Sequence, residues 1–180
     1  MASFESSPTS SSSDPTEKWT YDVFLSFRGK DTRHNFVNRL YAALVRRGIY
    51  AFKDDEMIRR GKLISTELLK AIEQSMFAVV IFSENYANSS WCLDELAKII
   101  ECQDRMGQKV LPVFYHVNPS DVRGQKRDFA TAFQQHEEEF TGNMDKVSKW
   151  RDALAAAANL SGWHILKTVD RLVFLDLFFG

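Results

Sequence analysis

The chain has 180 residues, of which 44% are hydrophobic and 26% are charged; this composition excludes a wholly disordered protein and fits one globular domain. Its 23 basic and 24 acidic residues nearly balance, so nonspecific nucleic-acid binding, which needs excess positive charge, is not expected. Two cysteines, Cys92 and Cys102, are too few for a disulfide framework or a four-cysteine zinc site. Free thiols are typical of a reducing compartment, so the expected location is the cytoplasm, with the nucleus as an additional candidate location.

The two ends of the chain differ in composition from the part between them. Residues 1–17 contain seven serines and little that is apolar, which predicts a disordered Ser-rich leader. The sequence predicts a folded domain over residues 18–165, and residues 166–180 stay unassigned. No segment reaches the roughly 18–20 apolar residues that cross a bilayer, so no membrane partner is expected.

Strand and helix signals alternate from residue 21 onward. Short apolar runs predict strands, and longer segments with an apolar stripe predict helices. The predicted strands are 23–26, 49–52, 77–82, 110–115 and 163–165, the predicted helices are 31–47, 63–75, 90 to about 106, 129–140 and 147–160, and a turn is predicted at 118–121. Continuous apolar strands separated by helices predict a parallel sheet covered on both faces. The expected fold is α/β, a three-layer flavodoxin-like sandwich with a five-stranded parallel sheet in the order 2-1-3-4-5.

In such a sheet, ligands bind at the carboxyl ends of the strands, at the point where the strand order reverses. Here that point lies between the loops after the first and third strands, and the charged loop at 53–62 borders it. The topology therefore brings one group of side chains to the same end of the sheet: Arg28, Asp54, Asp55, Ser89, Trp91 and Glu95.

Several usual functions of this architecture lack their motifs. The loop after the first strand holds Gly29 alone, not the three glycines of a dinucleotide-binding dehydrogenase, and no nucleotide-binding P-loop occurs. The strand ends carry no acid pair of the kind that a phosphate-accepting receiver domain uses. The histidines are far apart in sequence and do not predict a metal site: His34, His116, His136 and His164.

Glu95 lies at the border of the apolar stripe on its helix, which we assign to Leu93, Leu96, Ala97 and Ile100. Two interpretations are open at this point. A carboxylate beside Trp91 and other apolar groups is partly desolvated and acts strongly on a bound cation. Alternatively, Glu95 is a surface residue that pairs with Lys98 one turn later, and helix periodicity alone favours this second interpretation.

Four long segments resemble plant TIR (Toll/interleukin-1 receptor) domains. The first is Tyr21–Arg33, with the sequence YDVFLSFRGKDTR, and the others are FSENYA at 82–87, SWCLDEL at 90–96 and the stretch at 112–123. Shorter agreements lie at 150–154 and 161–163, so the resemblance covers about residues 19–165. Several ordered motifs of this length make the resemblance specific.

The resemblance implies self-association in innate immune signalling and NAD⁺ glycohydrolase activity that assembly switches on. It identifies Glu95 as the catalytic residue. Nicotinamide is a cationic leaving group, so no general acid is needed, and a carboxylate can stabilise the ribosyl cation. NAD⁺ or NADP⁺ is then the substrate, no cofactor is needed, and the product is nicotinamide with ADP-ribose or a cyclic variant.

The resemblance also suggests roles for the residues around Glu95. Ser89 and Trp91 match positions beside the substrate, although a helix cap and a core-edge aromatic are equally good interpretations. Arg28, next to Gly29, can hold a pyrophosphate, or can merely pair with Asp31 or Asp54. Asp54 and Asp55 lie in the loop that closes over the site in this family.

Self-association is expected to involve the first helix and the region of the last strand: His34, Asn38, Arg39, Gly162 and Trp163. Many plant relatives have a Ser-His pair where this chain has Asn38-Arg39. Facing copies of Arg39 would repel each other, so association through this helix is weakened or uses another TIR-domain protein. Two alternatives stay open, namely a non-catalytic adaptor and, against the near-neutral charge, nucleic-acid-templated assembly on the basic residues Arg123, Lys126 and Arg127.

Overall fold

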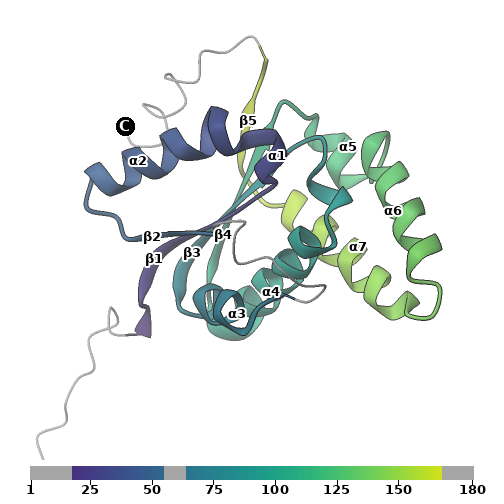
Figure 1. Ribbon diagram of the computed structural model, residues 1–180, viewed down its shortest axis with the longest axis horizontal. Helices are drawn as coiled ribbons and strands as arrows, with labels where there is room; N and C mark the ends of the chain where they lie inside the picture. Colours follow the sequence, from purple (N-terminus) through teal and green to yellow (C-terminus); the bar gives the residue numbers. More distant parts are fainter. Residues whose placement is uncertain (1–17, 55–63, 168–180) are drawn as a thin grey trace, which may run out of the picture.

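A computed structural model describes residues 18–54 and 64–167 of the chain. Its centre is a five-stranded sheet in which neighbouring strands are parallel and the strand order is β2-β1-β3-β4-β5. This confirms the predicted fold class and order (Figure 1). The strands are β1 Tyr21–Phe27, β2 Ala51–Lys53, β3 Ser75–Phe82, β4 Lys109–Tyr115 and β5 Trp163–Ile165.

Helices cover both faces of the sheet. They are α1 Gly29–Thr32, the π-helix η2 Arg33–Val37, α2 Asn38–Arg46, α3 Thr66–Glu73, the 3₁₀ helix η4 Tyr86–Asn88, α4 Ser90–Met106, α5 Pro119–Arg123, α6 Asp128–Glu139 and α7 Met144–Ala158. The helices η2 and α2 pack on one face, and α3, α4, α6 and α7 form the larger core on the other (Figure 1). This arrangement leaves the loops after β1 and β3 side by side at one end of the sheet.

Most predicted elements are present, and two differ in detail. The helix predicted at 31–47 buries its predicted stripe, which includes Phe36, Leu40 and Leu44. It begins earlier, at Gly29, and contains the π-helical turn η2 between α1 and α2. The turn predicted at 118–121 forms the short helix α5, which Asn118 caps by accepting a hydrogen bond from the backbone N–H of Ser120 at 2.9 Å.

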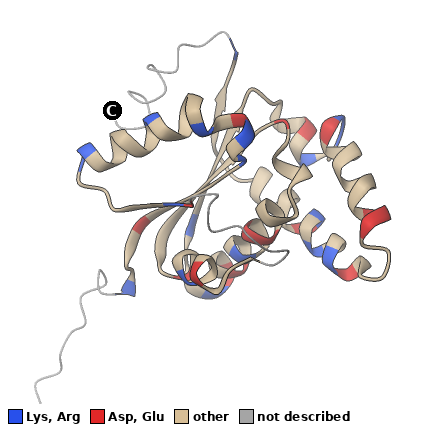
Figure 2. Cartoon of the chain, viewed as in Figure 1, with Lys and Arg blue, Asp and Glu red and all other residues tan. Residues whose placement is uncertain are grey.

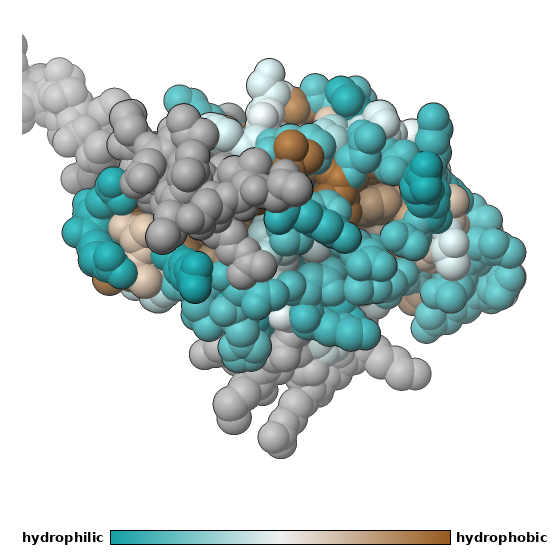
Figure 3. All heavy atoms as spheres, turned by 90° about the horizontal axis from the view of Figure 1, so that it is seen from above, coloured by the Kyte–Doolittle hydropathy of each residue, from teal (hydrophilic) through white to brown (hydrophobic). Residues whose placement is uncertain are grey.

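Charges of both signs are mixed over the helices, and few charged residues lie in the strands (Figure 2). The face shown in Figure 3 is mainly hydrophilic, with a small hydrophobic area. No helix among residues 18–54 and 64–167 is long and apolar enough to cross a bilayer. In the same ranges no three His, Cys, Asp or Glu side chains come together as metal ligands.

Gly162, just before the edge strand β5, lies directly against β4. A Cβ atom on this residue would overlap the carbonyl oxygen of Pro112. We therefore expect Gly162→Ala to lower the free energy of unfolding by about 1–3 kcal/mol, because β5 must move away from β4. Chemical denaturation monitored by circular dichroism measures this loss. The matched control is Gly142→Ala, since a Cβ atom on Gly142 meets nothing within 4 Å; equal stability of the two variants would contradict the packing argument.

Candidate functional site

Glu95 lies in the second turn of α4 and is buried, with 1% of its surface exposed. Its Oε2 accepts a hydrogen bond of 2.8 Å from the Oγ of Ser26 at the end of β1. The surface interpretation of Glu95 is therefore wrong. Lys98 instead pairs with Glu73 of α3 at 2.7 Å and with Glu101 at 3.6 Å, and the hydrogen bond with Glu73 raises the pKa of the Lys98 ammonium group.

The burial of Glu95 follows from a rotation of α4 relative to the predicted stripe. The buried residues of this helix include Cys92, Glu95, Ile99 and Cys102, which recur every three to four positions. The predicted stripe members Ala97 and Ile100 are only partly buried. A carboxylate on the buried face has lost its hydration, so the protein must supply its hydrogen bonds.

Sequence reasoning missed Ser26, although a signal was present. Ser26 follows Phe24 at a spacing of two in β1, so both side chains lie on the α4 side of the sheet. A fully buried serine within an apolar strand needs a polar partner on the helix that covers that strand. That helix offers Glu95.

Arg28 immediately follows β1 and is the N-cap residue of α1. Its Nε is buried, and within the described ranges it has no hydrogen-bond partner. Neither of the two acids considered from the sequence pairs with it there: the carboxylate of Asp31 binds the loop after β3, and the backbone oxygen of Asp54 accepts from Arg33 at 3.3 Å. A guanidinium group with unused donors two residues from Ser26 suits an anionic ligand.

Asp31 connects the two loops that border this end of the sheet. Its Oδ2 accepts hydrogen bonds from the Ser83 hydroxyl at 2.6 Å and the Asn85 backbone N–H at 2.8 Å, and its Oδ1 accepts one from the Asn85 amide at 2.9 Å. This bridge fixes α1, which follows Arg28, relative to the segment that leads into α4. It was not predicted, because Asp31 and Asn85 are far apart in the sequence.

We expect Asp31→Ala to lower the free energy of unfolding by about 2–4 kcal/mol, because it removes several charge-assisted hydrogen bonds and leaves their partly buried donors unpaired. Thermal unfolding monitored by calorimetry measures the effect. The exposed Glu84, next to Ser83, provides the control: Glu84→Ala should stay within about 0.5 kcal/mol of the wild type. Equal losses in both variants would mean that the bridge does not hold the loops.

The other residues predicted around Glu95 have diverse surroundings. Ser89 caps α4, since its hydroxyl accepts a hydrogen bond from the backbone N–H of Cys92 at 3.3 Å, and this confirms its structural interpretation. Trp91 is half-buried in the first turn of α4, and Gly29 is buried at the start of α1. Asp54 is buried after β2, whereas Asp55 lies outside the described residues.

The residues predicted for self-association lie on η2 and α2 and at the edge strand β5. His34, Asn38 and Arg39 are exposed on η2 and α2, although the Asn38 amide oxygen also accepts a hydrogen bond from Lys53 at 2.9 Å. Gly162 is exposed and Trp163 is half-buried in the edge strand β5. Gly162 also has a packing role against β4, so substituting it would not test association alone.

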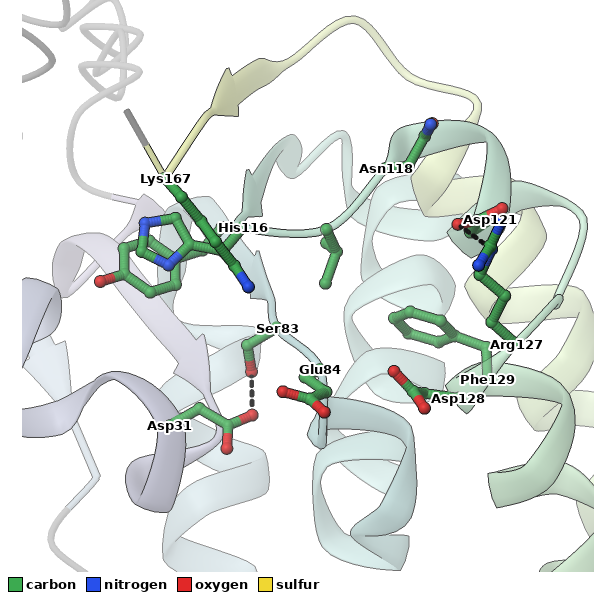
Figure 4. A pocket seen from close by; sticks show the side chains of 12 residues that line it. Asp31, Ser83, Glu84, His116, Asn118, Asp121, Arg127, Asp128, Phe129 and Lys167 are labelled. Carbon is green, nitrogen blue, oxygen red and sulfur yellow. Dashed lines mark hydrogen bonds and ion pairs between the residues drawn. The ribbon is translucent and has the colours of Figure 1, made fainter. Parts of the chain in front are cut away.

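A cavity of about 430 Å³ opens beside the carboxyl ends of β3 and β4 (Figure 4). The hydrogen bond between Asp31 and Ser83 forms part of its wall, and the ion pair of Asp121 with Arg127 at 3.3 Å forms another part. The cavity lies at the same carboxyl end of the sheet as Ser26, but neither Glu95 nor Arg28 is among its lining residues.

The two cysteines and the buried histidine have structural rather than nucleophilic roles. Cys92 and Cys102 are free, as predicted, and both are buried. Burial raises the pKa of the Cys102 thiol, which keeps it neutral and a poor nucleophile. The Nε2 of His136 lies 2.7 Å from the carbonyl oxygen of Ala87, so we assign the proton to this nitrogen. These groups hold α4 and α6 in place and do not form a nucleophilic site.

Comparison with known proteins assigns the chain to a family. Residues 20–177 match the family described as "TIR domain". The chain is 57% identical over 165 residues to the disease resistance protein RPV1 of Vitis rotundifolia, covering 92% of this chain and 12% of the relative. It is 53% identical over 151 residues to the TMV resistance protein N of Nicotiana glutinosa, covering 84% and 13%. The chain thus spans about an eighth of the length of these relatives.

Solved structures agree with this assignment. The TIR domains of the activated Roq1 resistosome, which directly recognises the pathogen effector XopQ, are 48% identical with a TM-score of 0.82, covering 89% of this chain and 98% of that one. The RPS4 and RRS1 TIR domain heterodimer, at 20% identity and a TM-score of 0.52, shares the fold. Both the sequence motifs and the parallel sheet therefore have the same explanation: this chain belongs to the TIR domain family.

Proposed function

We propose that this chain is a signalling domain of a plant immune protein, that it self-associates, and that the associated form hydrolyses NAD⁺ between ribose and nicotinamide. The observation that carries the proposal is the buried carboxylate of Glu95, held by Ser26 at the end of the sheet where the Nε of Arg28 has no hydrogen-bond partner among the described residues. The names of the resistance-protein relatives and of the Roq1 assembly support the immune role and the self-association.

The proposed reaction needs one carboxylate. The bond between C1′ of ribose and the nicotinamide nitrogen breaks, both electrons leave with nicotinamide, and the positive charge passes to the ribosyl group. Glu95 stabilises this cation through its negative charge, which acts strongly because the surroundings are apolar. Water then attacks C1′ and loses a proton, which gives ADP-ribose; attack by the adenine of the same molecule would give a cyclic product. NADP⁺ contains the same bond.

Burial of Glu95 also indicates how the activity would be controlled. With 1% of Glu95 exposed, a substrate reaches the carboxylate only after neighbouring groups move. Assembly of several copies can supply this rearrangement, so specific activity should depend on protein concentration.

Nicotinamide release measured over a wide range of protein concentrations tests the proposal. We expect the rate per molecule to rise steeply as self-association, followed in parallel by light scattering, becomes appreciable. A preparation that associates fully and still releases no nicotinamide from either NAD⁺ or NADP⁺ would overturn the enzymatic part.

The same burial favours a second candidate function, a non-catalytic adaptor that recruits other TIR-domain proteins. The exposed residues His34, Asn38 and Arg39 on η2 and α2 would then form the contact surface. The adaptor function predicts that Arg39→Asp abolishes immune output in plant tissue while Glu95→Ala leaves it intact. The enzymatic function predicts that Glu95→Ala abolishes the output.

A further inference from the structure

A line of buried polar groups runs from Glu95 into the core. Ser26 donates a hydrogen bond of 2.8 Å to Glu95, the hydroxyl oxygens of Ser26 and Tyr86 are 2.8 Å apart, and the Tyr86 hydroxyl is 3.1 Å from the carbonyl oxygen of Cys92. Ser26 and Tyr86 have no exposed surface. The groups come from β1, η4 and α4, which meet at the end of the sheet where the strand order reverses.

The number of protons in this line fixes the direction of its hydrogen bonds. An ionised Glu95 can only accept, so Ser26 must give it its single proton, and the Ser26 oxygen is then available to accept from Tyr86. If Glu95 is protonated on Oε2, the line can reverse, with Glu95 donating to Ser26, Ser26 to Tyr86, and Tyr86 to the Cys92 carbonyl. Rotation of two hydroxyl groups thus accommodates both charge states of Glu95.

The packing around Tyr86 limits its movement. Its ring meets the ring of Phe82 edge to face, with centroids 5.2 Å apart. The phenol oxygen therefore stays within hydrogen-bond distance of Ser26 in both charge states and restrains the position of the Ser26 oxygen. The Ser26 hydroxyl in turn favours one orientation of the Glu95 carboxylate.

From this geometry we infer that Ser26 and Tyr86 are positioning residues for Glu95, an inference that rests on the proposed NAD⁺ hydrolysis. Ser26 fixes the carboxylate toward the place where the ribosyl cation forms, and Tyr86 acts on the carboxylate through Ser26. Neither residue touches the substrate, so both affect kcat rather than KM. Replacement of a buried polar network by apolar groups is often neutral for stability, so stability alone does not account for this line of groups.

The test uses Ser26→Ala, Tyr86→Phe and the double variant. We expect kcat for nicotinamide release to fall about 10–100-fold in Ser26→Ala, as is usual when a group that orients a site residue is lost, with KM within about twofold. A smaller fall, about 3–10-fold, is expected in Tyr86→Phe. Because Tyr86 acts through Ser26, the double variant should equal Ser26→Ala rather than show the product of the two losses. Ser26→Thr, which keeps the hydroxyl, should recover a large part of kcat.

Matched controls separate positioning from general damage to the core. Ser75→Ala removes another buried serine hydroxyl, which donates to Ala71 at 2.6 Å at the start of β3, and Tyr115→Phe removes a buried hydroxyl with no hydrogen-bond partner in the described ranges. Both controls should keep kcat. Multiplicative losses in the double variant, or a kcat for Ser26→Ala within twofold of the wild type, would overturn the inference.

A second readout distinguishes failure of this inference from failure of the proposed function. The side-chain carboxyl carbon of Glu95, labelled with ¹³C and assigned with the help of Glu95→Gln, reports its hydrogen bonds by NMR without any turnover. Its resonance should move in both Ser26→Ala and Tyr86→Phe and stay in place in Ser75→Ala. An inactive wild type in which these shifts occur would refute NAD⁺ hydrolysis but keep the hydrogen-bonded line, whereas an active wild type without the shifts would refute the positioning roles alone.

Discussion

Replacement of Glu95 by glutamine should abolish nicotinamide release while leaving the fold intact. Glutamine has nearly the same shape and its amide oxygen can still accept the hydrogen bond from Ser26, which is 2.8 Å from Glu95 in the native chain. The negative charge that would stabilise a ribosyl cation is lost, and we expect kcat to fall at least about 100–1000-fold. Chromatographic measurement of nicotinamide at a fixed, fully associated protein concentration gives this number.

The same variant should be no less stable than the wild type. Burial of an ionised carboxylate is costly, and a neutral isostere at the position removes that cost. A thermal unfolding temperature equal to or above that of the wild type, with activity lost, is the expected combination. Glu101→Gln on the exposed side of α4 serves as the control and should keep full activity. Retention of wild-type kcat in Glu95→Gln would remove Glu95 from the proposed reaction.

Replacement of Arg28 should weaken substrate binding more than it slows the reaction. Its guanidinium group is the cationic group nearest in sequence to Ser26 at the end of β1, and its Nε has no partner in the described ranges. If Arg28 holds the pyrophosphate, Arg28→Ala removes charge-assisted hydrogen bonds worth about 1.5–3 kcal/mol, which corresponds to a rise in KM for NAD⁺ of about 10–150-fold.

Arg28→Lys distinguishes this role from simple charge. Lysine keeps the charge but cannot form the two parallel hydrogen bonds of a guanidinium group, so KM should be intermediate. The exposed Arg105, which pairs with Glu101 at 3.2 Å far along α4, gives the control Arg105→Ala, for which KM should not change. An unchanged KM in Arg28→Ala would show that the substrate is held elsewhere.

The fold could be predicted from the sequence because its strands are continuous apolar runs. The β3 residues Phe77–Phe82 are a clear example, and β5 was predicted with the bounds that the structure shows. The π-helical turn η2 was not predicted, since hydrophobic periodicity cannot resolve one extra residue in a helical turn. The bounds of several other elements shifted by one to three residues, because helix ends depend on local capping, whereas α4 has the predicted bounds.

Only part of the site could be predicted, because contacts between residues far apart in the sequence leave no local pattern. Topology alone brings Arg28 and Glu95 to the same end of the sheet, and the structure agrees. Helix periodicity placed Glu95 on the surface, because it treats a glutamate as polar. Periodicity within one helix contains no information about Ser26, the hydrogen-bond partner that β1 provides. The bridge made by Asp31 escaped prediction for the same reason, since its partners follow β3.

Both edge strands of the sheet are short: β2 has Ala51–Lys53 and β5 has Trp163–Ile165. Each edge offers only a few backbone N–H and C=O groups to an incoming chain, too few to nucleate extension of the sheet by foreign strands. High local concentration therefore does not favour extension of this sheet by strands of neighbouring copies.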